Sequence, residues 1–106
     1  MAQFDVHATL GWLRERTPYV VIIQSSRFQR SPTRLVAPLI FLREPLEETE
    51  LTPRFEMQGR TVFLDPLRIF AMPTNRLGQR IASLADDDSS TRIIAAIDQV
   101  ISRAFG

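Results

Sequence analysis

Few residues in this chain could carry out acid–base, nucleophilic or metal chemistry. His7 is the only histidine, and the chain contains no cysteine and no lysine. These absences exclude a thiol nucleophile, a sulfur-rich metal site, a Schiff base and a Gly-Lys-Ser phosphate-binding loop. His7 lies on the side of an alternating stretch opposite Phe4 and Val6, so we expect it to be an exposed strand residue. Nothing in the sequence resembles the active site of an enzyme.

Three consecutive aspartates, Asp86 to Asp88, are the strongest candidate for binding a divalent cation. They also precede Ser89-Ser90 and a segment with helical periodicity. At that place an aspartate can cap the helix, and its charge interacts favourably with the helix dipole. We therefore assign the three aspartates to helix capping and predict neither a metal nor a cofactor.

The length and composition predict one globular domain that spans residues 1–106. Hydrophobic residues make up 44% of the chain and charged residues 24%, which is ordinary for a globular protein with a single modest core. No apolar run approaches the roughly 18–20 residues that a membrane span requires, and no leader peptide opens the chain. We therefore expect a cytoplasmic protein that does not contact membranes.

The charges are distributed unevenly. Between Arg14 and Arg43 there are six arginines and one acidic residue, Glu15, whereas four glutamates crowd residues 44–50. The formal net charge of +1 argues against a dedicated nucleic-acid-binding protein. A basic half beside an acidic loop suggests electrostatic selection of a partner, although a solvated surface is the commoner explanation of such a pattern.

Hydrophobic patterns predict five or six antiparallel strands followed by a C-terminal helix. Gln58-Gly59 separates two strand-like runs by two residues, which is typical of a tight hairpin. Pro38 cannot donate a hydrogen bond to a neighbouring strand, so we expect its nitrogen to lie at a free edge or at a bulge. Segment 74–84 has partly helical spacing interrupted by Gly78, and its structure stays open. The predicted strands are 4–10, 19–23, 34–41, 52–57, 60–64 and 67–72.

The C-terminal segment carries the clearest pattern. Apolar residues recur at helical spacing from Ile93 to Ala104, which predicts a helix of about four turns with one apolar stripe. We expect this stripe to pack on the sheet. Part of it, at the end of the helix, would remain for a second copy of the chain.

Seven short motifs in the same order make the chain resemble the CcdB family along almost its whole length. Each motif alone is weak evidence, but seven motifs in register are strong evidence. The second and third motifs also align with the family pattern without a gap between them. The motifs are Gln3-Phe4-Asp5-Val6, Val21-Ile22-Ile23-Gln24-Ser25-Ser26, Arg34-Leu35-Val36-Ala37-Pro38-Leu39, Leu51-x-Pro53 with the Gly59 turn, Met72-Pro73 with Gly78, Ile81-Ala82-x-Leu84, and Ile93-x-Ala95-Ala96-Ile97.

The resemblance implies a mainly β fold with a C-terminal α-helix, an SH3-like barrel of five to seven antiparallel strands that is shared with MazF-type toxins. It also implies a homodimer and the toxin role in a type II toxin–antitoxin system. Such toxins are not enzymes: they bind the GyrA chains of DNA gyrase and trap that enzyme on cleaved DNA. A CcdA-like antitoxin with a disordered tail neutralises them, and DNA is contacted only indirectly, through that antitoxin, when the operon is repressed.

The C-terminal tip departs from the family pattern. Gyrase-poisoning members end their helix in Phe-Trp-Gly-Ile, whose tryptophan anchors the contact, and Ile101-Ser102-Arg103-Ala104 stands there instead. Loss of an interface tryptophan can remove about 2–4 kcal/mol of binding free energy. Arg27 and Phe28 replace two adjacent isoleucines of the family. The resemblance therefore implies an altered gyrase-binding surface made of Ser25, Arg27, Phe28, Asp98, Ile101, Ser102, Arg103, Ala104 and Phe105.

Two further surfaces follow from the sequence and the resemblance. The dimer interface is expected at Val100, Ile101 and Phe105, which the apolar stripe leaves for a partner. The antitoxin's acidic segment is expected to bind arginines, whose guanidinium groups match carboxylates, with Arg27 and Arg34 extending the basic surface. Trp12 is as consistent with core packing as with partner contact. The predicted antitoxin-binding residues are Trp12, Arg14, Arg16 and Arg30.

Two other functions remain open from the sequence. MazF-like endoribonuclease toxins share this fold, but their Gly-Asp-[Ile/Val] strand opening is missing here. Alternatively, the chain is a degraded CcdB homologue that acts only as an antitoxin-binding co-repressor of its operon. A small reading frame upstream, encoding a protein with a basic head and an acidic tail, would support any of the toxin functions.

Overall fold

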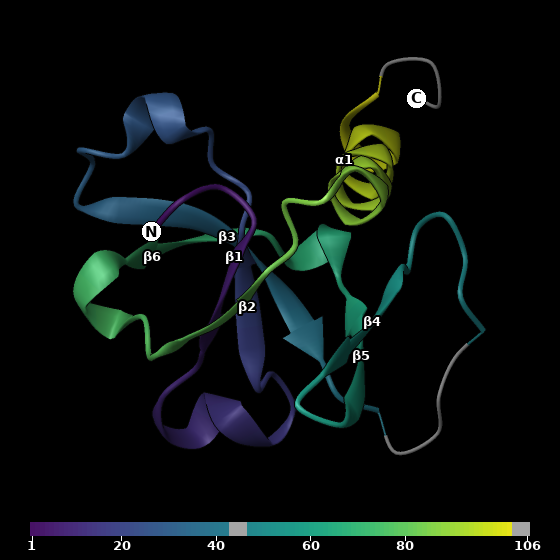
Figure 1. The fold of residues 1–106 in the computed structure, drawn as a ribbon, viewed down its shortest axis with the longest axis horizontal. Helices are drawn as coiled ribbons and strands as arrows, with labels where there is room; N and C mark the ends of the chain where they lie inside the picture. The colour runs from purple at the N-terminus through teal and green to yellow at the C-terminus, as the bar shows by residue number, and fades with distance from the viewer. Residues whose placement is uncertain (43–46, 103–106) are drawn as a thin grey trace.

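The computed structural model describes residues 1–42 and 47–102, without the side chains of Trp12 and Leu13. This part of the chain contains seven strands and one α-helix (Figure 1). Four short 3-10 helices connect them. The strands are β1 Asp5–Ala8, β2 Tyr19–Ile22, β3 Thr33–Ile40, β4 Arg54–Met57, β5 Arg60–Leu64, β6 Phe70–Pro73 and β7 Arg80–Ser83. The helices are η1 Gly11–Glu15, η2 Ser26–Phe28, η3 Pro66–Arg68, η4 Thr74–Arg76 and α1 Asp87–Ile101.

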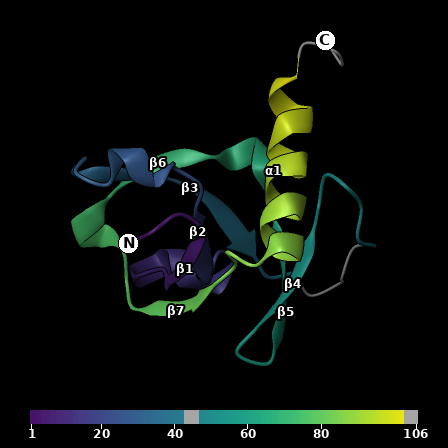
Figure 2. The same ribbon diagram turned by 45° about the horizontal axis from the view of Figure 1, so that its top comes forward.

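The strands form one curved antiparallel sheet in the order β4-β5-β3-β2-β1-β7, and β6 pairs with β3 beside this path. Every pairing is antiparallel. This half-barrel with one C-terminal helix confirms the predicted fold class. Figure 2 shows α1 standing beside the β4–β5 hairpin, at one side of the sheet.

Strand β3 exchanges one neighbour for another along its length. Thr33 to Val36 pair with β6, and Leu39 and Ile40 pair with β5. Pro38 lies at the changeover, and its carbonyl accepts a hydrogen bond from the Asp65 N–H at 3.0 Å. Because the nitrogen and carbonyl of one strand residue face the same side, the proline nitrogen faces the gap between β6 and β5. Pro38 therefore lies in an interior strand, at the changeover between two neighbours, and not on an outer edge of the sheet as one of the two expected positions would have it.

The central strands separate two hydrophobic clusters, and this arrangement explains why β2 is buried on both faces. The first cluster lies under α1, where Ile93 and Ala96 are fully buried. The second lies on the other face of the sheet and includes Leu77, from the segment after β6. Burial of apolar surface on both sides supplies the main stabilisation of the fold, at about 25 cal/mol per Å².

The structure corrects the predicted environment of His7. This side chain is only 4% exposed, although the strand pattern predicted an exposed position. His7 pairs with Val20, which belongs to the second cluster, and its Nδ1 lies 2.9 Å from the carbonyl oxygen of Gly78. The strand pattern identified the correct face, but it could not show that the segment after β6 covers that face.

Gly78 allows this covering segment to approach β1. A Cβ at Gly78 would lie 2.5 Å from the backbone oxygen of Ala8, closer than any side chain permits. The Gly78 N–H also donates to that oxygen, at 2.9 Å. Segment 74–84, which the sequence left open, therefore forms η4 and β7 and no α-helix.

Local signals account for the turns. Gln58 and Gly59 have φ values of 51° and 77°, the left-handed pair that a two-residue type I′ hairpin requires, as the sequence predicted. The predicted strand at 67–72 is shorter than expected and begins at Phe70. Its first residues form η3 because Asp65 caps that turn by accepting the Leu67 N–H at 3.2 Å.

Helix α1 begins as the sequence predicted. The carboxylate of Asp86 accepts the Ser89 N–H at 2.9 Å, which makes Asp86 the N-cap. The apolar stripe is only partly covered, because Ile94 and Ile101 remain 48% and 70% exposed. Among the residues that the structure describes, no helix is long and apolar enough to cross a membrane.

Candidate functional site

Three of the predicted gyrase-contact residues lie together in the loop between β2 and β3. Ser25 caps η2 by accepting the Arg27 N–H at 3.3 Å. Arg27 and Phe28 both point into solvent, and Phe28 is 60% exposed. Phenylalanine and arginine are both residue types that are enriched at protein interfaces. The loop therefore exposes an aromatic and a charged side chain that a partner protein could contact.

The buried side chain of Arg34 binds the backbone of this loop. It is 6% exposed, and its guanidinium donates to the carbonyl oxygens of Gln29, Ser31 and Thr33. The bonds to Ser31 and Thr33 measure 2.6 and 3.0 Å. Because these donors are used inside the chain, the expectation that Arg34 extends the basic binding surface is wrong. Arg34 positions the loop that carries Phe28.

The other predicted gyrase-contact residues lie at the end of α1. Asp98 is exposed, Ile101 is 70% exposed, and Ser102 is the half-buried C-cap. The expected dimer residue Val100 is 37% exposed. Arg103, Ala104 and Phe105 lie outside the described residues. The η2 loop and the end of α1 are well separated in both views, so one chain does not join the two parts of the predicted surface (Figures 1 and 2).

The predicted antitoxin-binding residues also fall into two places. Trp12, Arg14 and Arg16 lie in or beside η1, before β2, whereas Arg30 follows η2, after β2. The four-residue strand β2 separates them, and the purple η1 and the blue η2 lie at opposite ends of the molecule in Figure 1. The structure thus brings Arg14 and Arg16 together but does not bring Arg30 to them.

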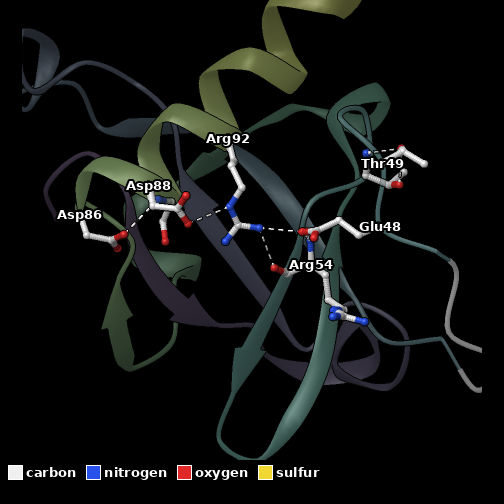
Figure 3. A network of polar contacts seen from close by, with 8 residues as sticks. Glu48, Thr49, Arg54, Asp86, Asp88 and Arg92 are labelled. Carbon is white, nitrogen blue, oxygen red and sulfur yellow. Dashed lines mark hydrogen bonds and ion pairs between the residues drawn. The ribbon is translucent and has the colours of Figure 1, made fainter.

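A polar network that the sequence analysis did not identify connects α1, β4 and the acidic loop (Figure 3). Arg92 Nη1 lies 2.7 Å from Glu48 Oε2, and Arg92 Nε lies 3.2 Å from Asp88 Oδ2. The Glu48 carboxylate also accepts the Arg54 N–H at 2.9 Å, while Arg92 donates to the Arg54 carbonyl at 3.0 Å. Arg92 also lies over the ring of Phe55, 4.5 Å from its centroid.

This network satisfies the outer edge of β4, which ends the sheet. The outward N–H and carbonyl of Arg54 would pair with another strand, and the side chains of Glu48 and Arg92 take that place. Unpaired edges invite association with other chains, and side-chain blocking is one common defence. The acidic loop is therefore attached to α1 and β4 through Glu48, and further along through Glu50, which accepts from Gln99 at 3.0 Å.

Two carboxylates beside α1 have lowered pKa values. The pKa of Glu48 is lowered mainly by the hydrogen bond from the Arg54 N–H and further by the charge of Arg92, against the opposing effect of desolvation. The pKa of Asp86 is lowered mainly by the hydrogen bond from the Ser89 N–H. Both groups are thus held in their charged form, as acceptors for the helix and the edge strand.

Part of this network had a signal in the sequence. Asp88 and Arg92 are spaced i, i+4 on a helix, a pattern that favours an ion pair. The partnership between Glu48 and Arg92 joins residues 44 positions apart, and only the fold reveals it. In the part of the chain that the structure describes, no group of three or more His, Cys, Asp or Glu residues is placed to hold a metal ion.

Comparison with known proteins shows the family of this chain. A family model described as CcdB protein matches residues 3–102, nearly the whole chain. The chain belongs to the CcdB family. This membership confirms the resemblance inferred from the seven motifs and makes the chain a member of a family of toxins from toxin–antitoxin systems. No curated protein matches the sequence.

Two solved structures with a similar fold are endoribonucleases. One is an endoribonuclease in complex with its cognate antitoxin from a Mycobacterial species, with a TM-score of 0.76 and 10% identity over 97% of this CcdB chain and 96% of that chain. A second is an endoribonuclease from a Mycobacterial species, with a TM-score of 0.70 and 10% identity over 95% of this chain and 90% of that one. At this identity the likeness shows a common fold alone.

Proposed function

We propose that this chain is the toxin of a type II toxin–antitoxin pair and that its target is DNA gyrase. In this proposal it binds GyrA and stabilises the complex of gyrase with cleaved DNA. The observation that carries the proposal is the match to the CcdB family over residues 3–102. The exposure of Phe28, at one place of the expected contact surface, supports it.

The environment of His7 supports a toxin that acts by binding. The only imidazole of the chain is buried, and its Nδ1 is engaged with the Gly78 carbonyl. A general base must reach the proton that it removes, directly or through one water. His7 is poorly placed for that role in RNA cleavage.

The proposal includes two protein partners besides gyrase. A second copy of the chain would pack against the exposed end of the apolar stripe on α1, at Val100 and Ile101. A CcdA-like antitoxin would neutralise the toxin by covering its basic surface with an acidic segment. The fold neighbour that carries its cognate antitoxin supports this second partner.

One observation favours a second candidate, an endoribonuclease toxin. Two solved structures with a similar fold are endoribonucleases, and each matches nearly the whole chain. An RNA-cleaving toxin needs an exposed anionic-substrate site, and exposed arginines such as Arg14 and Arg16 would supply positive charge. The family match ranks this candidate second.

Controlled expression in bacteria tests the two candidates together. A gyrase-directed toxin should arrest growth, break chromosomal DNA in a gyrase-dependent manner and leave messenger RNA intact. A ribonuclease should arrest growth with cleaved messenger RNA and intact DNA. Growth without arrest, at a protein level confirmed by immunoblot, would contradict both candidates.

A further inference from the structure

The side chain of Gln24 connects strand β3 to the η2 loop, residues 23–32. Its Oε1 atom accepts a hydrogen bond from the Leu35 N–H at 3.0 Å, and its Nε2 atom donates to the carbonyl oxygen of Phe28 at 3.1 Å. Only one orientation of the amide group satisfies both contacts, because its oxygen cannot pair with another carbonyl oxygen. Gln24 is half-buried, so water has limited access to this side chain.

The main chain makes room for this side chain where β2 and β3 separate. The N–H groups of Ile23 and Gln24 both donate to the Leu35 carbonyl, at 3.0 and 3.3 Å. In a continued antiparallel ladder, the Ile23 carbonyl would accept the Leu35 N–H in return. Here the Ile23 carbonyl accepts from the side chain of Gln3 instead, at 3.1 Å. The Gln24 side chain therefore takes the place of a main-chain acceptor for Leu35.

The main chain of Phe28 is fixed at both its carbonyl and its N–H. The carbonyl accepts from Gln24 and also from the Ser31 N–H, at 3.0 Å, and the Phe28 N–H donates to the Ser25 carbonyl at 3.1 Å. The Phe28 side chain nevertheless remains 60% exposed. An aromatic side chain on a fixed main chain loses little conformational freedom when it binds a partner. Phe28 thus has the properties of a preorganised anchor.

We propose that Gln24 is a positioning residue for gyrase binding: its amide group holds the main chain of Phe28 so that the exposed ring meets the partner in one orientation. The inference rests on the proposed function where it takes that partner to be GyrA. Both ends of the Gln24 amide are used inside the chain, so its role in binding is indirect. Arg34 supports the same loop through other carbonyls, and Gln24 is the side chain that bonds to Phe28 itself.

Surface plasmon resonance with purified GyrA and the full chain tests this role. Gln24→Glu keeps an oxygen that can accept the Leu35 N–H but removes the donor to Phe28, and it should weaken GyrA binding about fivefold or more. Phe28→Ala should weaken binding by about tenfold or more. When Gln24→Glu is added to Phe28→Ala, the further loss should stay below about twofold, because the effect of Gln24 passes through the Phe28 ring.

Gln29→Glu is the matched control. It introduces the same charge into the same loop, at an exposed side chain, and should leave the affinity for GyrA within about twofold. Urea denaturation of each variant shows whether it is folded under the conditions of the binding measurement.

Hydrogen–deuterium exchange of the free chain tests the positioning without gyrase. The amides of Phe28 and Ser31 should exchange about fivefold faster or more in Gln24→Glu, because the loop opens more readily once the bond to the Phe28 carbonyl is lost. They should exchange at the parent rate in Gln29→Glu. The amides of the buried strand β2 provide an internal reference and should not change in either variant.

Three outcomes would overturn the inference. Equal losses of GyrA affinity in Gln24→Glu and Gln29→Glu would assign the effect to the added charge. An undiminished effect of Gln24→Glu in the Phe28→Ala background would show that Gln24 does not act through Phe28. Unchanged exchange of the Phe28 and Ser31 amides would show that the side chain does not order the loop. If the parent chain does not bind GyrA but exchange changes as expected, the gyrase proposal fails and the positioning of Phe28 by Gln24 stands.

Discussion

At the scale of single residues, the arginines of this chain divide into structural and free groups that the sequence does not distinguish. Arg34 is buried and donates to backbone carbonyls, and Arg92 joins two carboxylates to an edge strand. Arg14, Arg16 and Arg60 have no ion-pair partner among residues 1–42 and 47–102. The free group is the one available to partners.

Arg34→Met should destabilise the protein by about 2–4 kcal/mol, because it leaves the carbonyls of a tight loop without their donors. Arg27→Met changes an exposed arginine of the same loop and should alter the free energy of unfolding by less than about 0.5 kcal/mol. Urea denaturation of both variants measures the difference. Equal stability of the two variants would contradict the role given to Arg34.

Glu48 should contribute a pH-dependent stabilisation. Its pKa is lowered from the ordinary value of 4.5 in the folded chain, so its contribution is complete above that value and is lost as the pH falls through the lower folded-state pKa. The contribution should stay below about 1 kcal/mol because the Glu48–Arg92 pair is exposed to water. Thermal unfolding of Glu48→Gln and the parent chain should therefore differ at pH 7 and converge in strong acid. A difference that is unchanged in acid would contradict this account.

At the scale of elements, sequence reasoning succeeded where the signal is local. The Asp86 cap, the Gln58-Gly59 turn and the buried strand β2 each depend on a few neighbouring residues, and all three were predictable. The covering of His7 by segment 74–84 depends on Gly78 meeting Ala8 across the sheet. No local sequence pattern indicates such a contact, and for this reason the sequence analysis predicted that His7 is exposed.

In the candidate site, too, contacts between segments distant in the sequence were missed. Phe28 and Ile101 were predicted from the resemblance, and both are exposed. The stacking of Arg60 on Phe41 escaped detection because Arg60 begins β5 and Phe41 follows the end of β3, and the β3–β5 pairing brings the two together. The burial of Arg34 likewise depends on how its own loop folds back over it.

The C-terminal tip, where the resemblance to the family implies an altered gyrase contact, can be tested by a graft. Replacing Ser102-Arg103-Ala104 by Trp-Gly-Ile should increase binding to GyrA roughly 30- to 1000-fold, because a buried tryptophan can contribute about 2–4 kcal/mol. Toxicity should rise with it. Surface plasmon resonance and growth assays measure both. Unchanged binding and toxicity would show that the contact surface lies elsewhere.

At the scale of the whole molecule, we predict a homodimer built on the exposed part of the α1 stripe. Sedimentation equilibrium at micromolar concentration should give twice the chain mass of 12.1 kDa. Ile101→Glu should shift the equilibrium to the monomer, since it places a charge in an apolar interface. Leu10→Glu, a change at an exposed leucine away from α1, should leave the dimer intact. A monomer mass for the parent chain would contradict the prediction.

The fold alone is compatible with two kinds of toxin. The half-barrel with one helix matches endoribonucleases at 10% identity, while the family match points to CcdB proteins. A fold fixes where surfaces can form, and the side chains on those surfaces decide the target. The choice between gyrase and RNA is therefore a question about exposed residues, and a reaction with purified components answers it.

The most direct test is a cleavage reaction with purified gyrase, supercoiled plasmid, ATP and the purified chain. After denaturation of the enzyme with detergent and protease, the account predicts linear plasmid that accumulates with toxin concentration, because the toxin holds gyrase on cleaved DNA. Omission of gyrase should abolish the linear product. If the chain arrests growth in cells but gyrase in this reaction keeps its full activity and yields no linear DNA, the claim that the chain traps gyrase on cleaved DNA is contradicted.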